Sequence, residues 1–432
     1  MSAMGAQQQK FTTTISVQNP SLAWTALSEV PNTISVEPVE LFAEDRAPSR
    51  GLLYRPKGRP AKVGIHFMHP RADQSTNYNI LPLVKAGCMV LGRSARWPGN
   101  DTATTHEHLL LDVAAGIRRL REEGCEEVVL VGNSGGGTLA AFYQEQASAA
   151  KGGRLTDTAA GDPFDLNAFD LPCADGLVVI GGHIGQGGIM RKLIDPSVVD
   201  EHDPLATDPR LDMYDPANGF VQPPAASHYD ADFLTRYAAA QEDRVRRIDA
   251  RAFAMIERQR EALRTVEKLG DGASLTQRRA ASLDELMIVY RTTAYPAFVD
   301  PSIEADGRVV RSYFSGSPQD ENFRAGGFGR YLSPRAWLST WSANHSRANT
   351  VRNLAGSSGK LLVVHYSGDC GTRMSEAQAM FAASPAQDKQ FARVEGIDHY
   401  GLQIMPDGQP GPRNWKGTEI LVDWVREKFH CD

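Results

Sequence analysis

The chain has 432 residues, enough for two or three ordinary domains or for one domain with a large insertion. Its net charge of −6 and charged fraction of 23% are ordinary for a globular protein and argue against a nucleic-acid binder or a polybasic membrane binder. Residues 1–9 are polar, and no stretch approaches 18 uninterrupted apolar residues. We therefore expect neither a signal peptide nor a membrane span.

The cysteines and histidines show no metal-binding or disulfide pattern. The five cysteines are widely scattered, their number is odd, and no CxxC occurs. This usage fits free thiols in a reducing compartment, so we expect a cytoplasmic protein without a cofactor. The pairs His66/His69 and His106/His108 lie in no H-E-x-x-H frame and near no Cys/His cluster. We predict no metal site.

The first part of the chain is predicted to form strands that then alternate with helices. β-rich or apolar runs predict strands at 34–41, 51–54, 63–68, 89–91 and 127–131. Between the last two, Leu109, Val113 and Ile117 fall on one face of a predicted helix over 108–123. The run EVVLV at 127–131 is short and fully apolar, which is typical of a strand buried on both faces. The alternation indicates a parallel sheet in an α/β fold.

The next two predicted strands, 176–180 and 360–365, are separated by about 180 residues, far more than one crossover needs. We therefore divide the chain into a core at 1–185, an inserted subdomain at 186–349, and the rest of the core at 350–432. Within the insertion, 230–269 predicts one long amphipathic helix or two. Its apolar stripe indicates core packing or an oligomer seam, and a homodimer is one of the possible assemblies. A polar stretch, 147–174, is predicted to be a surface loop. A strand at 391–394 and a helix at 418–428 are predicted to complete the core.

One motif carries chemistry: Gly132-Asn133-Ser134-Gly135-Gly136. The apolar strand precedes it and a predicted helix follows from 138, as a nucleophile elbow requires. Small residues let such a turn close around a strained serine, and the N-terminus of the following helix favours a developing negative charge. A phosphate-binding turn is the alternative, but neither G-x-x-x-x-G-K-[ST] nor G-x-G-x-x-G occurs here. We predict that Ser134 is the nucleophile of a serine hydrolase.

This stretch resembles the α/β-hydrolase superfamily, and the resemblance covers roughly residues 30–185 and 355–430. It implies a mostly parallel eight-stranded sheet flanked by helices, with the insertion as a large, mainly helical cap after the sixth strand. It also implies the chain order nucleophile, acid, histidine.

The resemblance places the acid and the histidine in the last part of the chain. Asp369 follows the strand 360–365 in a Ser-Gly-Asp turn, and His399 follows the last strand, 30 residues later. Asp398 is the rival acid, but adjacent residues do not normally orient each other's rings. Asp369 as a plain turn residue and His399 as a structural histidine remain alternatives. His365 lies within a strand and is interpreted as a core histidine.

The oxyanion hole needs two backbone donors. Gly135 is expected to supply one, directly after the nucleophile. The resemblance places the other in the loop after Met68, where His69-Pro70-Arg71 stands in place of the frequent His-Gly. Proline has no N–H, so Arg71 is the expected donor, with Ala72 second. The candidates for substrate binding are His69, Asn133, His183 and Tyr400.

The predicted reaction is cleavage of a carboxylic ester of a small to medium, partly apolar molecule through an acyl-enzyme; the choice of an ester rests on analogy. Aromatic residues of the insertion, among them Tyr313, Phe314, Phe328 and Trp341, are candidates for the pocket wall or for its core. A carbon–carbon bond (ketone) hydrolase or a thioesterase on the same triad is the alternative. A non-catalytic ligand-binding protein on this scaffold is an alternative of another class.

Overall fold

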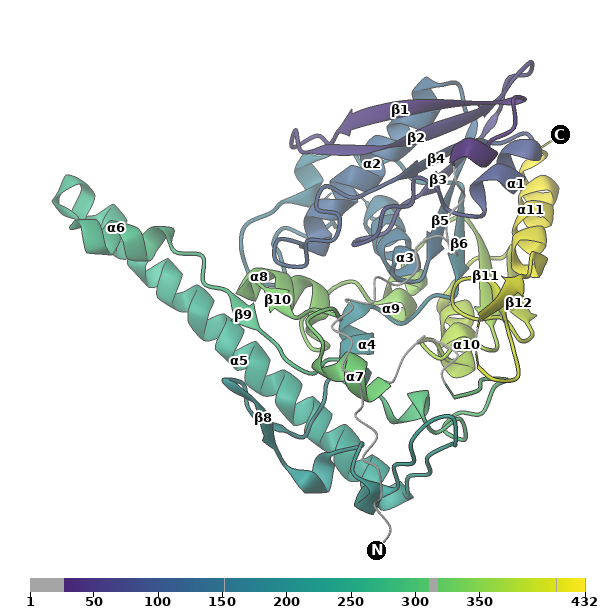
Figure 1. Ribbon diagram of the computed structural model, residues 1–432. Helices are drawn as coiled ribbons and strands as arrows, with labels where there is room; N and C mark the ends of the chain where they lie inside the picture. Colours follow the sequence, from purple (N-terminus) through teal and green to yellow (C-terminus); the bar gives the residue numbers. More distant parts are fainter. Residues whose placement is uncertain (1–26, 151, 311–317, 409, 432) are drawn as a thin grey trace, which may run out of the picture.

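A computed structural model describes residues 27–150, 152–310, 318–408 and 410–431 (Figure 1). Residues 1–9 and the aromatic candidates Tyr313 and Phe314 lie outside these ranges. The core is one sheet of eight strands in the order β1-β2-β4-β3-β5-β6-β11-β12. The strands are β1 (Ile34–Phe42), β2 (Pro48–Pro56), β3 (Val63–Phe67), β4 (Met89–Arg93), β5 (Glu127–Asn133), β6 (Gly176–Ile180), β11 (Lys360–Tyr366) and β12 (Lys389–Val394).

The pairing confirms the predicted mostly parallel sheet. β2 pairs antiparallel with both β1 and β4, while every pairing from β4 across to β12 is parallel. Each strand predicted from the sequence is present, with ends that differ by a few residues. The inserted segment follows the sixth strand, as expected.

Helices cover both faces of the sheet, because alternate strand residues point to opposite sides. Val128 and Leu130 of β5 pack with α2 (His106–Glu122), α3 (Gly135–Ser148) and α10 (Met374–Ala383). Val129 and Val131 pack on the other side with α1 (Ile80–Lys85) and α11 (Lys416–Phe429). A strand buried on both faces must be apolar throughout, which explains the unbroken EVVLV run.

The stretch 147–174, predicted to be a surface loop, is mostly irregular and half-buried or exposed. Leu166 and Leu171 are nevertheless buried in the same core cluster as α2 and α3. Asp162 of this stretch also pairs with Arg260 and Arg335 of the insertion. The polar residues between these leucines masked the apolar contacts that the chain makes there.

The insertion, residues 186–349, is mainly helical. It contains α4 (Gln186–Leu193), α5 (Ala231–Leu269), α6 (Leu275–Ser282), α7 (Pro318–Phe323) and α8 (Pro334–Ala336), with the short strands β7 (Val198–Asp200), β8 (Asp203–Thr207), β9 (Met287–Ile288) and β10 (Tyr331–Leu332). Helix α9 (Thr350–Ala355) and the hairpin of β13 (Leu402–Ile404) and β14 (Pro410–Arg413) belong to the connections around β11 and β12. No helix in the described ranges combines the length and apolar character needed to cross a membrane.

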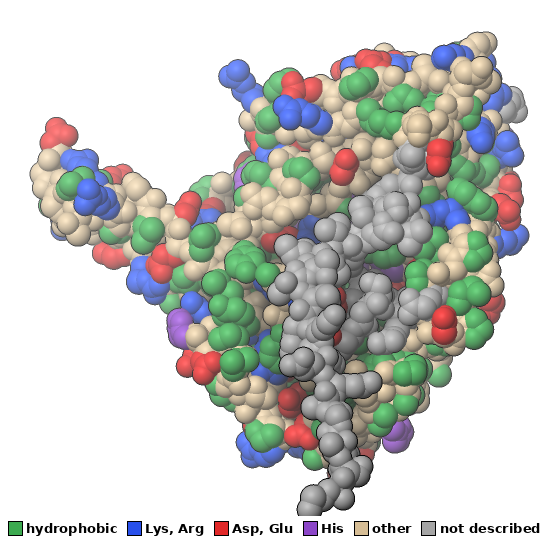
Figure 2. Space-filling view, viewed as in Figure 1, with side chains coloured by type: hydrophobic (Ala, Val, Ile, Leu, Met, Phe, Trp, Pro, Cys, Tyr) green, Lys and Arg blue, Asp and Glu red, His purple; other side chains and the backbone are tan. Residues whose placement is uncertain are grey.

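The predicted long helix is a single one of 39 residues, α5, which begins at its N-cap Asp230. Val245, Ile248, Ala252 and Met255 of its apolar stripe are buried in a cluster with Trp337, so this part of the stripe packs within the insertion. Beyond Ile256 no residue of α5 is buried, and with α6 the helix projects from the body as an arm (Figures 1 and 2). The domain boundaries at 185 and 349 and a homodimer remain predictions.

A buried ionic network holds the base of the insertion together. Asp195 lies just after α4 and accepts hydrogen bonds from Arg291 Nε at 2.9 Å and Asn322 Nδ2 at 2.7 Å. The Ser197 amide and hydroxyl donate to its other oxygen. Neither Asp195 nor Arg291 is more than 1% exposed. Three segments far apart in the sequence therefore converge on one carboxylate.

Removal of that carboxylate should destabilise the protein strongly. Asp195→Ala leaves the buried Arg291 charge uncompensated, and we expect it to lower the free energy of unfolding by about 3–5 kcal/mol. Asp208→Ala is the matched control, because Asp208 pairs with the exposed Arg210 and its loss should have a much smaller effect. Chemical denaturation followed by circular dichroism measures both. Equal stability of the two variants would contradict this role for Asp195.

Candidate active site

The serine elbow lies where β5 ends and α3 begins. Ser134 has φ 57° and ψ −126°, a backbone conformation that residues with a side chain rarely adopt. Its amide donates to Ile180 O of β6 at 2.9 Å, and its carbonyl accepts from Gly137 N at 3.0 Å. These bonds hold the serine in place at the carboxyl edge of the sheet.

The neighbouring glycines are needed because other backbone segments come very close. A Cβ atom on Gly136 would lie 2.6 Å from Met68 O, at the end of β3. A Cβ atom on Gly132 would overlap the backbone of Gly136 and Gly137, within the turn itself. Real Cβ atoms do not approach other atoms this closely, so the turn closes only with glycine at these positions. The first turn of α3 is thereby directed at Ser134.

Asp369 and His399 form a buried pair after β11 and β12. Nδ1 of His399 lies 2.6 Å from Asp369 Oδ2. Asp369 also accepts hydrogen bonds from Gly371 N at 2.7 Å and from Thr372 Oγ1 at 2.9 Å. Burial opposes charge on both groups, yet the mutual attraction prevails: the pKa of Asp369 is lowered and the pKa of His399 is raised from their ordinary values.

The rival groups have other partners. Asp398 accepts from the backbone amides of Tyr400 at 2.9 Å and Leu402 at 2.8 Å, which makes it a turn residue. Burial raises the pKa of Asp398 to about 6. His365 lies 2.6 Å from Asp306 of the insertion, through Nε2 and Oδ2. It is thus a buried histidine that contacts the insertion and not Ser134.

A narrow pocket of about 40 Å³ brings most of the predicted residues together. Ser134, His399, His69, Arg71 and His183 all line it. Two candidates for substrate binding lie outside its wall. The side-chain amide of Asn133 donates to Ile180 O at 3.0 Å. The Tyr400 ring lies edge-on to the His399 ring, with the ring centres 5.2 Å apart. Asn133 thus bonds to the strand beside the serine turn, and Tyr400 contacts the histidine.

Sequence reasoning missed several wall residues. The pocket is also lined by Gln186, Ile189, Phe328, Trp341, Gly371 and Thr372. Thr372 had a signal, since it lies three residues after Asp369, where a hydroxyl can return to the carboxylate. Phe328 and Trp341 were among many aromatic candidates in the insertion, and nothing in the spacing singles them out.

The loop after β3 differs from the expectation. The amides of Arg71 and Ala72 both donate to His69 Nδ1, at 3.0 and 2.9 Å. Pro70 has no backbone N–H, and the next two amides donate to the His69 ring. The Arg71 N–H, which was expected to serve the oxyanion hole, therefore already has an acceptor. The Arg71 guanidinium pairs with Asp101 at 2.5 Å and packs over the rings of Phe328 and Trp341. Its charge is therefore matched by a carboxylate within the protein.

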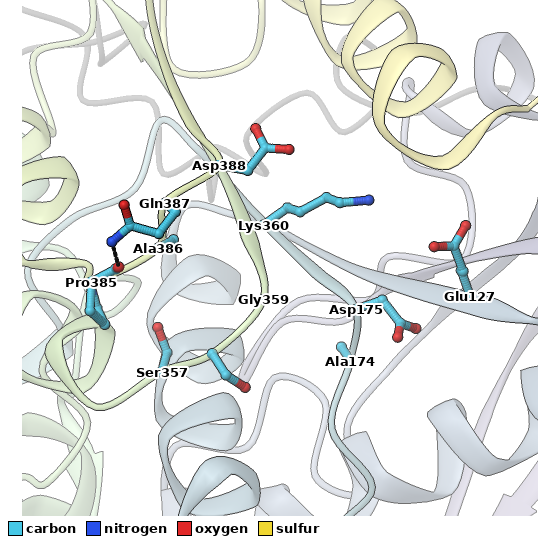
Figure 3. A pocket seen from close by; sticks show the side chains of 11 residues that line it. Glu127, Ala174, Asp175, Ser357, Gly359, Lys360, Pro385, Ala386, Gln387 and Asp388 are labelled. Carbon is cyan, nitrogen blue, oxygen red and sulfur yellow. Dashed lines mark hydrogen bonds between the residues drawn. The ribbon is translucent and has the colours of Figure 1, made fainter.

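A larger hollow of about 650 Å³ lies at the opposite end of the sheet (Figure 3). Glu127 and Lys360, which begin β5 and β11, are among its lining residues. Lys360 Nζ donates to Lys428 O at 2.5 Å and lies 4.3 Å from the centre of the Phe429 ring. Ligands of open α/β sheets bind at the carboxyl ends of the strands, where Ser134 lies.

Within the described ranges, no group of three or more His, Cys, Asp or Glu side chains could hold a metal ion.

No protein-family model and no curated protein matches this chain. Solved structures similar to it include the esterase domain of a Rhodothermus marinus protein, with 13% identity, a TM-score of 0.39 and coverage of 91% of this chain and 99% of that one. An esterase from Pyrococcus furiosus has 10% identity, a TM-score of 0.42 and 91% coverage of both chains. The bacterial brefeldin A esterase has 14% identity, a TM-score of 0.41 and coverage of 94% and 81%.

The sheet itself settles the architecture. It has eight mostly parallel strands, and the serine turn lies between β5 and α3, as the sequence resemblance implied. The loops after β11 and β12 bring Asp369 and His399 together at the same edge. The chain has the α/β-hydrolase fold.

Proposed function

We propose that this protein is a serine hydrolase that cleaves a carboxylic ester with Ser134, His399 and Asp369 as its triad. One observation carries the proposal: a strained serine at the N-terminus of α3 shares a pocket with a histidine that is bonded to a buried carboxylate. Strain at a non-glycine residue persists only where the surrounding structure enforces it, and such positions cluster at functional sites.

The geometry supports an acyl-transfer mechanism. Ser134 Oγ attacks the carbonyl carbon of the substrate and forms a C–O bond, while its proton passes to His399 Nε2. The π electrons move to the carbonyl oxygen, and Asp369 stabilises the resulting imidazolium. Collapse of this intermediate breaks the ester C–O bond, and His399 protonates the departing alkoxide. Water, deprotonated by His399, then releases the acid from Ser134.

The pocket supports a small, partly apolar acyl group. Ile189, Phe328 and Trp341 supply apolar walls from the insertion, while histidine side chains surround the serine. A space of about 40 Å³ holds only a few atoms, so a long chain would require these walls to move. A thioester or a ketone could react through the same steps, and a substrate panel separates these reactions from ester cleavage.

The first prediction concerns the nucleophile. Ser134→Ala should lower the hydrolysis of p-nitrophenyl acetate by at least about 10³-fold, because the acyl-enzyme can no longer form. A fluorophosphonate probe should label the unaltered protein at Ser134 and leave the variant unlabelled. Ser282→Ala, on the projecting arm, is the control and should behave as the unaltered protein does. A folded unaltered protein that the probe does not label would favour the non-catalytic ligand-binding alternative.

The second prediction concerns pH. Only neutral His399 can accept the serine proton, so activity should fall as pH drops through its pKa, which Asp369 holds above the ordinary value of about 6.5. Asp369→Asn removes that charge; the acidic limb should move to lower pH and kcat should drop about 10²–10⁴-fold. Asp306→Asn, beside His365, is the matched control and should leave the limb in place. A profile that is flat from pH 5 to 8 would contradict His399 as the base.

The third prediction concerns chain length. Because the pocket is narrow, p-nitrophenyl acetate and butyrate should be cleaved faster than the octanoate. Phe328→Ala removes part of the wall and should raise the octanoate-to-acetate ratio of kcat/KM by about tenfold, the effect of roughly two methylenes of new apolar contact. Tyr331→Ala alters an exposed ring of the insertion and should leave the ratio unchanged. An unchanged ratio in the Phe328 variant would place the acyl group elsewhere.

A further inference from the structure

The ring of His69 is held in one orientation by its own loop. Nδ1 lies 3.0 Å from Arg71 N and 2.9 Å from Ala72 N, and both amides can only donate. The ring nitrogen that accepts them must carry a lone pair and no proton. The proton of the neutral ring is therefore on Nε2, which becomes a hydrogen-bond donor.

The surroundings keep this ring neutral. Burial, reinforced by the positive charge of Arg71, holds the pKa of His69 well below its ordinary value. The ring is therefore held in its neutral form more strongly than an ordinary histidine is. Its tautomer follows from two backbone donors that no change near neutral pH removes.

The Nε2 atom lies close to the residue that is expected to supply the first oxyanion donor. A Cβ atom on Gly135 would lie 3.0 Å from His69 Nε2, and Gly135 is the residue directly after the nucleophile. His69 and Ser134 also line the same pocket. An oxyanion hole consists of two such donors converging on one point.

We propose that His69 is a catalytic residue: its Nε2–H, together with the Gly135 amide, binds the oxyanion that forms when Ser134 attacks the substrate. This inference rests on the proposed function. The imidazole replaces the second backbone amide of the oxyanion hole. Pro70 has no N–H, and the amides of Arg71 and Ala72 already donate to His69 Nδ1. The hydrogen bond from a neutral donor of fixed orientation strengthens as the carbonyl oxygen gains charge.

Gln186 is the other side chain at this position, and its Nε2 lies nearer to a Cβ atom on Gly135 than His69 Nε2 does. Its carbonyl oxygen is buried and has no hydrogen-bond partner within the described part of the chain. Nothing comparable to the two amides at His69 therefore fixes the direction of the Gln186 amide. His69 is the preorganised donor, and preorganisation is what makes such a donor catalytic.

Two substitutions separate the two ring nitrogens. His69→Asn keeps an acceptor near the Nδ1 position for the Arg71 and Ala72 amides but removes the Nε2–H. His69→Gln keeps a donor near the Nε2 position but loses the acceptor. His430→Asn is the matched control, because His430 is exposed and has φ 52°, a conformation that asparagine tolerates.

With p-nitrophenyl acetate, His69→Asn should lower kcat by about 10²–10³-fold with little change in KM, because only the transition state carries the oxyanion. Phenylboronic acid, which forms a tetrahedral adduct on the serine, should lose affinity to a similar degree. His69→Gln should retain at least about tenfold more activity than His69→Asn. His430→Asn should match the unaltered protein, and thermal unfolding verifies that all variants are folded.

A measurement on the unaltered protein does not depend on the folding of the variants. Nitrogen-15 NMR of the histidine rings should show His69 protonated on Nε2 alone, with that proton shifted downfield once fluorophosphonate has modified Ser134. Full kcat in folded His69→Asn, or protonation on Nδ1, overturns this inference and leaves the triad standing. Failure of the unaltered protein both to hydrolyse esters and to react with the probe overturns the proposed function and this inference together.

Discussion

The close approach of three backbone segments around Ser134 is the constraint on which the rest of the site depends. β5 must turn directly into α3, and the backbone at the end of β3 must lie in direct contact with that turn. Any side chain at Gly132 or Gly136 would force these segments apart. The strain in the Ser134 backbone is thus imposed by the packing of the sheet against α3. The backbone of Ser134 is therefore fixed in one conformation, at a position where the residue lines the pocket.

The electrostatics of the pocket follow from burial. One negative charge, on Asp369, is stabilised by His399 and by two further hydrogen bonds. The other pocket histidines are kept neutral: burial holds the pKa of His69 well below its ordinary value and lowers that of His183 to about 3. Of the three pocket histidines His69, His183 and His399, only His399 is bonded to a carboxylate, and only its pKa is raised. In the proposed mechanism, chemically identical side chains thus have different roles: His399 is the base beside the acid, and His69 is a donor beside the serine.

The insertion completes the pocket that the sheet begins. It supplies the apolar walls Ile189, Phe328 and Trp341, while Arg71 from the core packs against the last two. The Asp195 network anchors its base close to α4, the helix that carries Gln186 and Ile189. In the proposed function, the side chains that limit substrate size are therefore remote in sequence from the triad. The arm formed by the ends of α5 and α6 plays no part in this wall.

The sequence by itself determined the elements and the chemistry that are local. The strands and the long helix followed from β-rich and apolar runs and from helical spacing, and the glycines around Ser134 predicted the turn, because each of these signals lies within a few residues. Asp369 and His399 were predicted from the family resemblance, which gives the chain order nucleophile, acid, histidine. Only the tertiary structure decided which groups meet in space. It paired Asp369 with His399, left Asn133 and Tyr400 outside the pocket wall, and placed Phe328 and Trp341 in it among many aromatic residues of the insertion. It also showed that the His69 ring takes the amides expected of the oxyanion hole, since a hydrogen bond depends on ring orientation, which spacing in the sequence does not encode.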